Sequence, residues 1–243
     1  MQWHYFETCD STNAAARRFF EAAHLQSTIL KSNTISDGFI AETQTQGRGT
    51  QNRMWVSPPG TGLYMSLLWP QCLLPSEQLP FLPLVVGIAA IDTLFELLPA
   101  LKGQVFLKAV NDLMTKNGEK LGGILIEAFS QQNSHTAVVI GLGLNLWKAP
   151  VLEPAYHDSH YQPMSLATLL PQWADSIQDK TLWRNHLARC ISEKLLVSPF
   201  LEILLSPGGP EPYSQETLLQ EWLLRALPGS QVSDLVARGL PKL

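Results

Sequence analysis

The sequence is poor in cysteine and in charge. Its three cysteines, Cys9, Cys72 and Cys190, are scattered and odd in number, so they offer neither a disulfide framework nor metal-ligand spacing. Charged residues make up 16% of the 243 residues and the formal net charge is -4. No run of Lys and Arg with interleaved aromatics appears, which argues against a nucleic-acid partner. A reducing, cytoplasmic location is expected.

Targeting signals and an uninterrupted apolar run are lacking too. The chain begins MQWHYFETCDSTN, without the charged-then-apolar pattern of a signal peptide. Pro83, Asp92 and Glu96 interrupt the most apolar stretch, residues 79–100, which predicts a buried helix and no membrane span. His157 and His160 are three residues apart but have no cysteine partners, so they predict no metal site.

The segment 42–58, ETQTQGRGTQNRMWVSP, is the strongest functional signal that is present. Two glycines flank Arg48, and Arg53 follows just before Trp55. Glycines let backbone N–H groups approach a ligand, and arginine offers a planar donor fork to phosphate or carboxylate. No Gly-Lys-Ser/Thr or GxGxxG follows. The segment therefore predicts a loop over a small anion, with an idle surface loop as the alternative.

Periodicity and turn signals predict strands first and helices later. The expected strands are residues 38–44, 62–69, 105–110, 121–129 and 136–146, and the expected helices are 14–23, 84–98, 183–195 and one that opens at Ser214. Asn117-Gly118 favours a tight hairpin between the third and fourth of these strands. Short connections imply antiparallel neighbours. We expect an α+β fold, a mixed and largely antiparallel sheet covered by helices.

Polar clusters stand at the edges of these apolar strands, and each has a simple structural explanation. Ser11 or Asn13 can cap a helix, and Asn111-Asp112 can start a turn. A single lysine such as Lys120 is most often a solvated residue. Glycines inside strands, at Gly122-Gly123 and at 141 and 143, point more strongly to the close approach of a ligand or of another backbone.

Taken together, the clusters resemble the catalytic domain of biotin–protein ligases. The matching pieces, in the family's order and at its spacing, are DSTN (10–13), AETQTQGRGTQNRMWVSPPGTGLYMSLLW (41–69), KAVNDL (108–113), GEKLGGILIE (118–127) and VIGLGLN (139–145). The resemblance implies an architecture like that of class II aminoacyl-tRNA synthetase cores. It also implies a catalytic domain over residues 1–226 and a short tail, 227–243, as the vestige of an SH3-like domain.

The resemblance implies a two-step reaction, in which biotin and ATP form biotinyl-5′-AMP and the acyl group passes to a lysine of a carboxylase's biotin-acceptor domain. It assigns Lys120 and Arg48 as catalytic residues. Biotin contacts would come from Ser11, Thr12, Asn13, Gln44, Gly47, Arg48, Gly122 and Gly123. Nucleotide contacts would come from Gly49, Thr50, Arg53, Trp55, Lys108, Asn111 and Asn145.

The resemblance also implies cosubstrates and partners. ATP would arrive with Mg²⁺, for which Asp112 is the expected carboxylate ligand. The usual acceptor is the carrier subunit of acetyl-CoA carboxylase. The assembly could be a monomer or a homodimer. Because the sequence begins directly at the catalytic domain, without the DNA-binding domain of some members, we expect no transcriptional control.

The chain departs from the family pattern at two places. Thr50 stands where the family usually has a second loop arginine, and Ala109-Val110 stands where it usually has Trp-Pro. Two other functions therefore stay open. One is a lipoate or octanoate ligase or transferase of the same superfamily, although a straight-chain acid needs no ureido contacts from Ser11 and Gln44. The other is a degenerate, non-catalytic biotin-binding homologue, against which the retained Lys120 argues.

Overall fold

The computed structural model describes residues 1–25, 34–130, 136–152, 161–205, 214–238 and 240. Its centre is a seven-stranded sheet with the strand order β1-β2-β3-β7-β6-β5-β4. The strands are β1 (Gln2–Cys9), β2 (Asp37–Gln44), β3 (Gly62–Trp69), β4 (Val105–Lys108), β5 (Asp112–Thr115), β6 (Lys120–Ser130) and β7 (Thr136–Asn145). β1 runs parallel to β2, and every other neighbouring pair is antiparallel. The predicted α+β class is confirmed.

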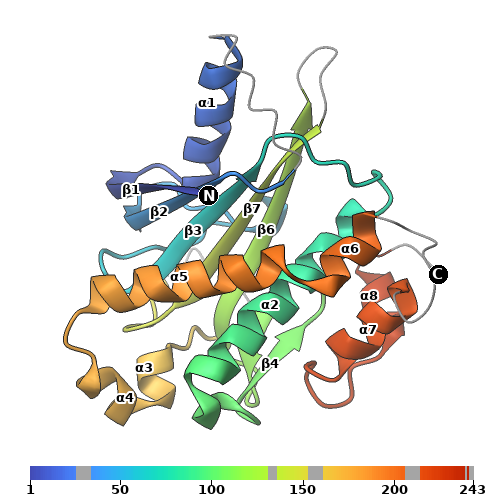
Figure 1. Ribbon diagram of the computed structural model, residues 1–243. Helices are drawn as coiled ribbons and strands as arrows, with labels where there is room; N and C mark the ends of the chain where they lie inside the picture. The colour runs from blue at the N-terminus through green and yellow to red at the C-terminus, as the bar shows by residue number, and fades with distance from the viewer. Residues whose placement is uncertain (26–33, 131–135, 153–160, 206–213, 239, 241–243) are drawn as a thin grey trace.

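Helices cover both faces of this sheet. Successive strand residues point to opposite faces, so Phe39, Leu68 and Val139 pack with α1 (Thr12–Leu25) while their neighbours join the larger core on the other side. The helices of the larger core are α2 (Leu82–Leu97), α5 (Lys180–Leu196), α6 (Pro199–Leu205) and α7 (Gln215–Leu223). In Figure 1, α5 and α2 cross in front of the sheet. β3 lies between both layers and is buried along its whole length.

The apolar segment 79–100 forms the core helix that its interruptions predict. Residues Leu79–Leu97 are long and apolar enough to cross a membrane by length and composition, but 67% of the most apolar window is buried inside the fold. Its two acidic residues lie at the rim, where Asp92 pairs with Arg225 and Glu96 pairs with Lys194. The ion pairs therefore tie α2 to the segment that follows α7 and to α5.

Two of the observed strands, β1 and β5, were not predicted from the sequence. β1 is half exposed and rich in polar residues, and β5 has only four residues, so neither gives a clear apolar signal. As a result, the prediction that Asn117-Gly118 joins the third and fourth expected strands is wrong. That turn joins β5 to β6, with Gly118 at a φ of 81° that favours glycine. The third expected strand ends at Lys108 and turns back through Ala109–Asn111 to pair with β5.

The remaining helices are short. They are α3 (Leu166–Leu169), α4 (Pro171–Ser176) and α8 (Val232–Ala237), with 3₁₀ turns η1 (Thr50–Asn52), η2 (Leu79–Phe81) and η3 (Pro99–Leu101). The expected helix start at Ser214 is confirmed, because its hydroxyl accepts a hydrogen bond from Thr217 N at 3.2 Å.

The C-terminal residues pack against the outer edge of the sheet. Leu107 in β4 bridges to Ala226, and Leu235 and Leu240 are buried in the main core cluster. Residues beyond 226 therefore share the core of the preceding residues. A domain boundary at 226, and an origin of the tail in an SH3-like domain, stay predictions.

Candidate active site

The turn from β1 into α1 brings together a buried polar cluster. Thr12 donates from its backbone N and its hydroxyl to Gln44 Oε1, at 2.8 and 3.2 Å. Ser66 Oγ lies 2.7 Å from Thr12 Oγ1 and 2.5 Å from Asn13 Oδ1, and its one hydroxyl proton can be donated to either oxygen. Ser11, Thr12 and Asn13 are all less than 5% exposed. Because β1 and β2 are parallel and end together, the sheet itself places Gln44 against this turn.

The Gly/Arg segment between β2 and β3 folds back on itself as a small hairpin. Trp55 N donates to Gly47 O, and Gly49 N donates to Arg53 O, both at 2.8 Å. A Cβ on Gly47 would stand 2.2 Å from Trp55 O, so only glycine fits there. Gly47 therefore allows the two sides of the hairpin to approach closely. Next to it, Arg48 and Met54 form a β-bridge across the hairpin.

Glu127, on β6, joins this loop to the polar cluster, although the sequence analysis did not select it. Its two carboxylate oxygens meet Arg48 Nη1 at 3.2 Å and Asn13 Nδ2 at 2.7 Å. A carboxylate within the otherwise apolar strand sequence LGGILIE is the one sequence signal that could have identified it.

Trp55 lies on a floor made by glycines of two paired strands. Gly123 of β6 and Gly143 of β7 are register partners, and a Cβ on either would meet the indole ring, at 3.2 and 2.5 Å. The Trp55 Nε1 is buried and has no hydrogen-bond partner among the described residues. Gly122 differs, because a Cβ there would strike Leu144 at 2.4 Å, so this glycine serves strand packing.

Lys120 begins β6 and lies near the Trp55 ring. Its Nζ contacts Asp112 Oδ1 at 2.6 Å, and it lies 5.7 Å from the Trp55 ring centroid. Backbone hydrogen bonds to Gln162 and Met164 hold the Lys120 main chain, and Asn145 supports Met164 O at 3.0 Å. Asn145 thus supports the segment that carries Pro163 and Met164.

These groups enclose a cavity with about 470 Å³ of empty space. Its lining combines polar side chains with apolar strand residues. The lining consists of Ser11, Thr12, Asn13, Gln44, Arg48, Gly49, Thr50, Trp55, Tyr64, Met65, Asn111, Lys120, Gly123, Ile124, Leu125, Gly141, Leu142 and Gly143. We call this the first cavity.

A second cavity adjoins the first, with Thr50, Asn111, Lys120 and Ile124 lining both. It adds Arg53, Asp112 and, from the C-terminal segment, Arg238. Lys108 lines neither cavity; its Nζ contacts Tyr161, which lines the second. Burial, followed by the charge of Arg238, lowers the pKa of Lys108. Gly47, Gly122 and Asn145 also lie outside both cavities.

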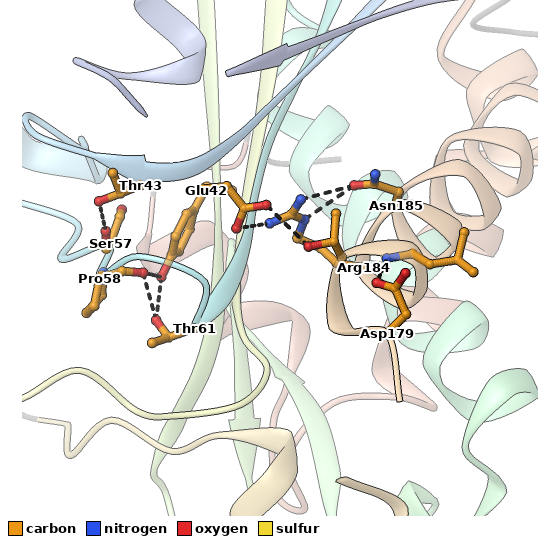
Figure 2. A network of polar contacts seen from close by, with 11 residues as sticks. Glu42, Thr43, Ser57, Pro58, Thr61, Asp179, Arg184 and Asn185 are labelled. Carbon is orange, nitrogen blue, oxygen red and sulfur yellow. Dashed lines mark hydrogen bonds and ion pairs between the residues drawn. The ribbon is translucent and has the colours of Figure 1, made fainter. Parts of the chain in front are cut away.

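Helix α5 supports the base of the Gly/Arg loop through a network drawn in Figure 2. Arg184, whose side chain is 5% exposed, pairs with Glu42 at 2.5 Å, two residues before Gln44. On the other side of the loop, Tyr64 OH donates to Pro58 O at 3.2 Å and contacts Thr61 Oγ1 at 2.9 Å. Burial raises the pKa of Tyr64 to about 12, so the hydroxyl stays protonated as the network requires.

The geometry gives limited scope for a resident metal. No group of three or more His, Cys, Asp or Glu side chains gathers in the described residues. Asp112 is a single carboxylate, already bonded to Lys120. This donor set fits a Mg²⁺ that arrives bound mainly by phosphate oxygens and water. His157 and His160 lie outside the described residues.

Comparison with known proteins identifies the family of the chain. The model of the Biotin/lipoate A/B protein ligase family matches residues 5–145. Because the match covers more than half of the chain, the chain belongs to this family.

Two curated relatives and one solved structure make the likeness more specific. The bifunctional ligase/repressor BirA of Bacillus subtilis is 31% identical over 167 residues, 68% of this chain and 48% of that protein. A biotin–[acetyl-CoA-carboxylase] ligase of Mycobacterium tuberculosis is 33% identical over 111 residues, 46% of this chain and 40% of that protein. The chain thus spans about half the length of these relatives or less.

The solved structure is the biotin protein ligase of Leishmania major in complex with biotin. It superposes with a TM-score of 0.69 and 26% identity, over 95% of this chain and 83% of that one. The likeness therefore extends well beyond the segment that the family model matches.

Proposed function

We propose that the chain is a biotin–[acetyl-CoA-carboxylase] ligase, which activates biotin with ATP and transfers it to a lysine of a carboxylase's biotin-acceptor domain. The observation that carries the proposal is the position of Lys120. It lines both the first cavity, which polar and apolar side chains form together, and the second cavity, which two arginines also line.

The first cavity suits a small neutral ring on an apolar chain. The ureido group of biotin offers two donors and one acceptor, and the buried cluster of Ser11, Thr12, Asn13 and Gln44 offers hydroxyls and amides in return. Hydrogen bonds already fix the side chains of Thr12, Asn13 and Gln44, so little entropy is lost when a ligand orders them. The apolar walls accommodate the valeryl chain and direct its carboxylate toward Lys120.

Activation requires the biotin carboxylate to approach an α-phosphate, although both are anions. A carboxylate oxygen bonds to the α-phosphorus, the bond to the β-phosphate oxygen breaks, and pyrophosphate leaves. Lys120 stabilises the charge that develops between the two groups, and Arg48 covers them from the loop side. A Mg²⁺ ion, when bound, neutralises charge on the phosphates, with Asp112 as its carboxylate ligand.

Transfer needs no covalent enzyme intermediate, because the mixed anhydride is already activated. The acceptor lysine's ε-amine attacks the biotinyl carbonyl, the amine loses a proton, and AMP leaves. Until the acceptor arrives, the chain must keep water from the anhydride. The loop of residues 47–55, with Trp55 on its glycine floor, is the proposed cover.

The proposal also covers the location and the partners of the chain. Free thiols at Cys9, Cys72 and Cys190 favour a reducing, cytoplasmic location. A nucleic-acid partner is not proposed, since the formal net charge is -4. A monomer and a homodimer both stay open.

ATP–pyrophosphate exchange, measured with biotin, lipoate and octanoate in turn, tests the function. We expect exchange with biotin only. Exchange with lipoate or octanoate would assign the other ligase activity, and no exchange with any acid would make the chain a binding protein. Lys120→Ala should abolish exchange while biotin still binds, and Lys116→Ala, which removes an exposed lysine from the neighbouring turn, should leave it unchanged.

A further inference from the structure

The second cavity gathers positive charge from distant parts of the chain. Arg53 comes from the Gly/Arg loop, Lys120 from β6 and Arg238 from the residue after α8. Among the described residues of its lining, Asp112 is the single acidic one, in a chain whose formal net charge is -4. A local excess of cations in an acidic protein indicates a site for an anion.

Arg238 is held in place by its backbone and its neighbours. Its N–H bonds to Leu235 O at 3.1 Å, and Leu235 and Leu240 on either side of it are buried. Further back, Leu107 N donates to Arg225 O at 2.7 Å and Leu227 N donates to Leu107 O at 2.9 Å. The C-terminal segment is therefore fixed to the edge of β4, next to the turn that carries Asn111 and Asp112.

The Arg238 side chain has capacity for a ligand. It is exposed, and no ion pair or hydrogen bond of its guanidinium is found in the part of the chain that the structure describes. Its charge is close enough to Lys108 to disfavour the protonated lysine. The charged forms of two neighbouring cations that repel one another are both stabilised when an anion binds beside them.

We infer that Arg238 binds the β- and γ-phosphates of the nucleotide and the pyrophosphate that leaves. The inference rests on the proposed function, which places the α-phosphate beside Lys120. The phosphates beyond it then extend from that junction into the second cavity, where Arg238 and Arg53 lie. A planar guanidinium offers such phosphates two parallel hydrogen bonds.

This assignment separates ligands by whether they carry the β- and γ-phosphates or the pyrophosphate formed from them. ATP and pyrophosphate carry the phosphates that reach Arg238, whereas AMP and biotinyl-5′-AMP do not. Arg238→Gln should therefore weaken the binding of ATP and of pyrophosphate by about fivefold to tenfold, which lies within the range for one ordinary hydrogen bond because the exposed guanidinium is solvated. Affinity for AMP, and the dissociation rate of biotinyl-5′-AMP, should stay as in the unchanged protein.

The experiment measures ATP KM in biotin-dependent exchange, pyrophosphate inhibition, AMP binding and the KM of the acceptor protein in biotin transfer, for three variants of the full chain. Arg238→Gln should show the selective loss, and Arg238→Lys should recover part of it because the charge is kept. Arg189→Gln is the matched control, since Arg189 is an exposed arginine on α5 that lines neither cavity. It should behave like the unchanged protein.

Three results would overturn the inference: unchanged ATP and pyrophosphate affinity in Arg238→Gln, equal weakening of AMP, or a loss confined to the KM of the acceptor protein. The last would make Arg238 an acceptor contact. Failure of the proposed function is a different outcome, because the unchanged protein would then show no biotin-dependent exchange at all.

Discussion

At the scale of single residues, Glu127 connects the Gly/Arg loop to the buried polar cluster. It neutralises Arg48 and at the same time orients Asn13. Because Arg48 is about half exposed, the ion pair contributes little to stability and is easily exchanged. A phosphate or carboxylate that enters the first cavity can thus take over the Arg48 guanidinium at small cost. The ion pair keeps the arginine near its working position.

Thr50 leads to the first prediction at this scale. It lines both cavities and is exposed, at the position where the family usually has a second loop arginine. Thr50→Arg adds a cation beside the phosphate of biotinyl-5′-AMP. Dissociation of the adenylate should slow by about fivefold, the effect of roughly 1 kcal/mol. Stopped-flow release of preformed adenylate measures it.

A matched control for this variant is Gln46→Arg, which adds the same charge to an exposed residue of the same loop outside both cavities. Its release rate should equal that of the unchanged protein. Equal rates for Thr50→Arg and the unchanged protein would refute the idea that Thr50 loosens adenylate retention.

At the scale of elements, α5 contributes to the site although none of its residues lines either cavity. Arg184 reaches β2 through Glu42, and the strand then presents Gln44 to the buried polar cluster. The same helix carries Lys194, which pairs with Glu96 in an exposed position. One helix thus offers a buried ion pair and an exposed one for direct comparison.

The second prediction uses that comparison. Arg184→Met leaves Glu42 without its partner and should lower the free energy of unfolding by about 2 to 3 kcal/mol, less than a fully buried pair because Glu42 is partly exposed. Lys194→Met should cost less than about 1 kcal/mol. Urea unfolding measures both, and biotin affinity should fall only in Arg184→Met. Equal losses of stability would show that the buried pair has no special role.

The elements also show what the sequence can and cannot predict. β3 was predicted at its observed bounds because it is apolar throughout and follows a Pro-Gly turn signal. β1 was missed because a half-buried edge strand needs no apolar run, and β5 because four residues give no period. The missing β5 then led to a wrong partner for the Asn117-Gly118 turn.

The candidate site was predictable to the extent that its residues stand in local motifs. Arg48, Trp55, Asn111, Lys120 and Gly123 line the first cavity as the motifs suggest. Glu127 and Tyr64 were missed because their partners are distant in sequence, and no spacing marks them. Arg238 had no motif at all, since tertiary packing of α8 alone brings it to the second cavity.

At the scale of the whole molecule, stability should fall at alkaline pH. The folded state raises the pKa of Tyr64 from 10.0 to about 12. The unfolded chain therefore loses this proton first, so the contribution is intact below pH 10 and is lost as pH rises toward 12. The expected loss is on the order of 2 kcal/mol. Buried Cys72 acts in the same direction, because its pKa rises to about 11.

Unfolding by urea between pH 8 and 12 tests this prediction. Tyr64→Phe should be less stable at pH 8, where it lacks the hydrogen bonds to Pro58 and Thr61, and should lose less stability above pH 10. Tyr5→Phe, which changes an exposed tyrosine, is the control and should keep the alkaline slope. A slope that Tyr64→Phe leaves unchanged would assign the alkaline loss to other groups.

The bridge between Leu107 and Ala226 has a consequence for self-association. An outermost strand exposes unpaired N–H and C=O groups and can extend its sheet into another molecule. On β4 the returning chain occupies these groups, with Leu107 bonded on both its N–H and its C=O. β1, with exposed Tyr5, is the other outermost strand of the described sheet and carries no such cover in the residues described. A dimer made by joining sheets would therefore meet at β1, far across the sheet from Arg238.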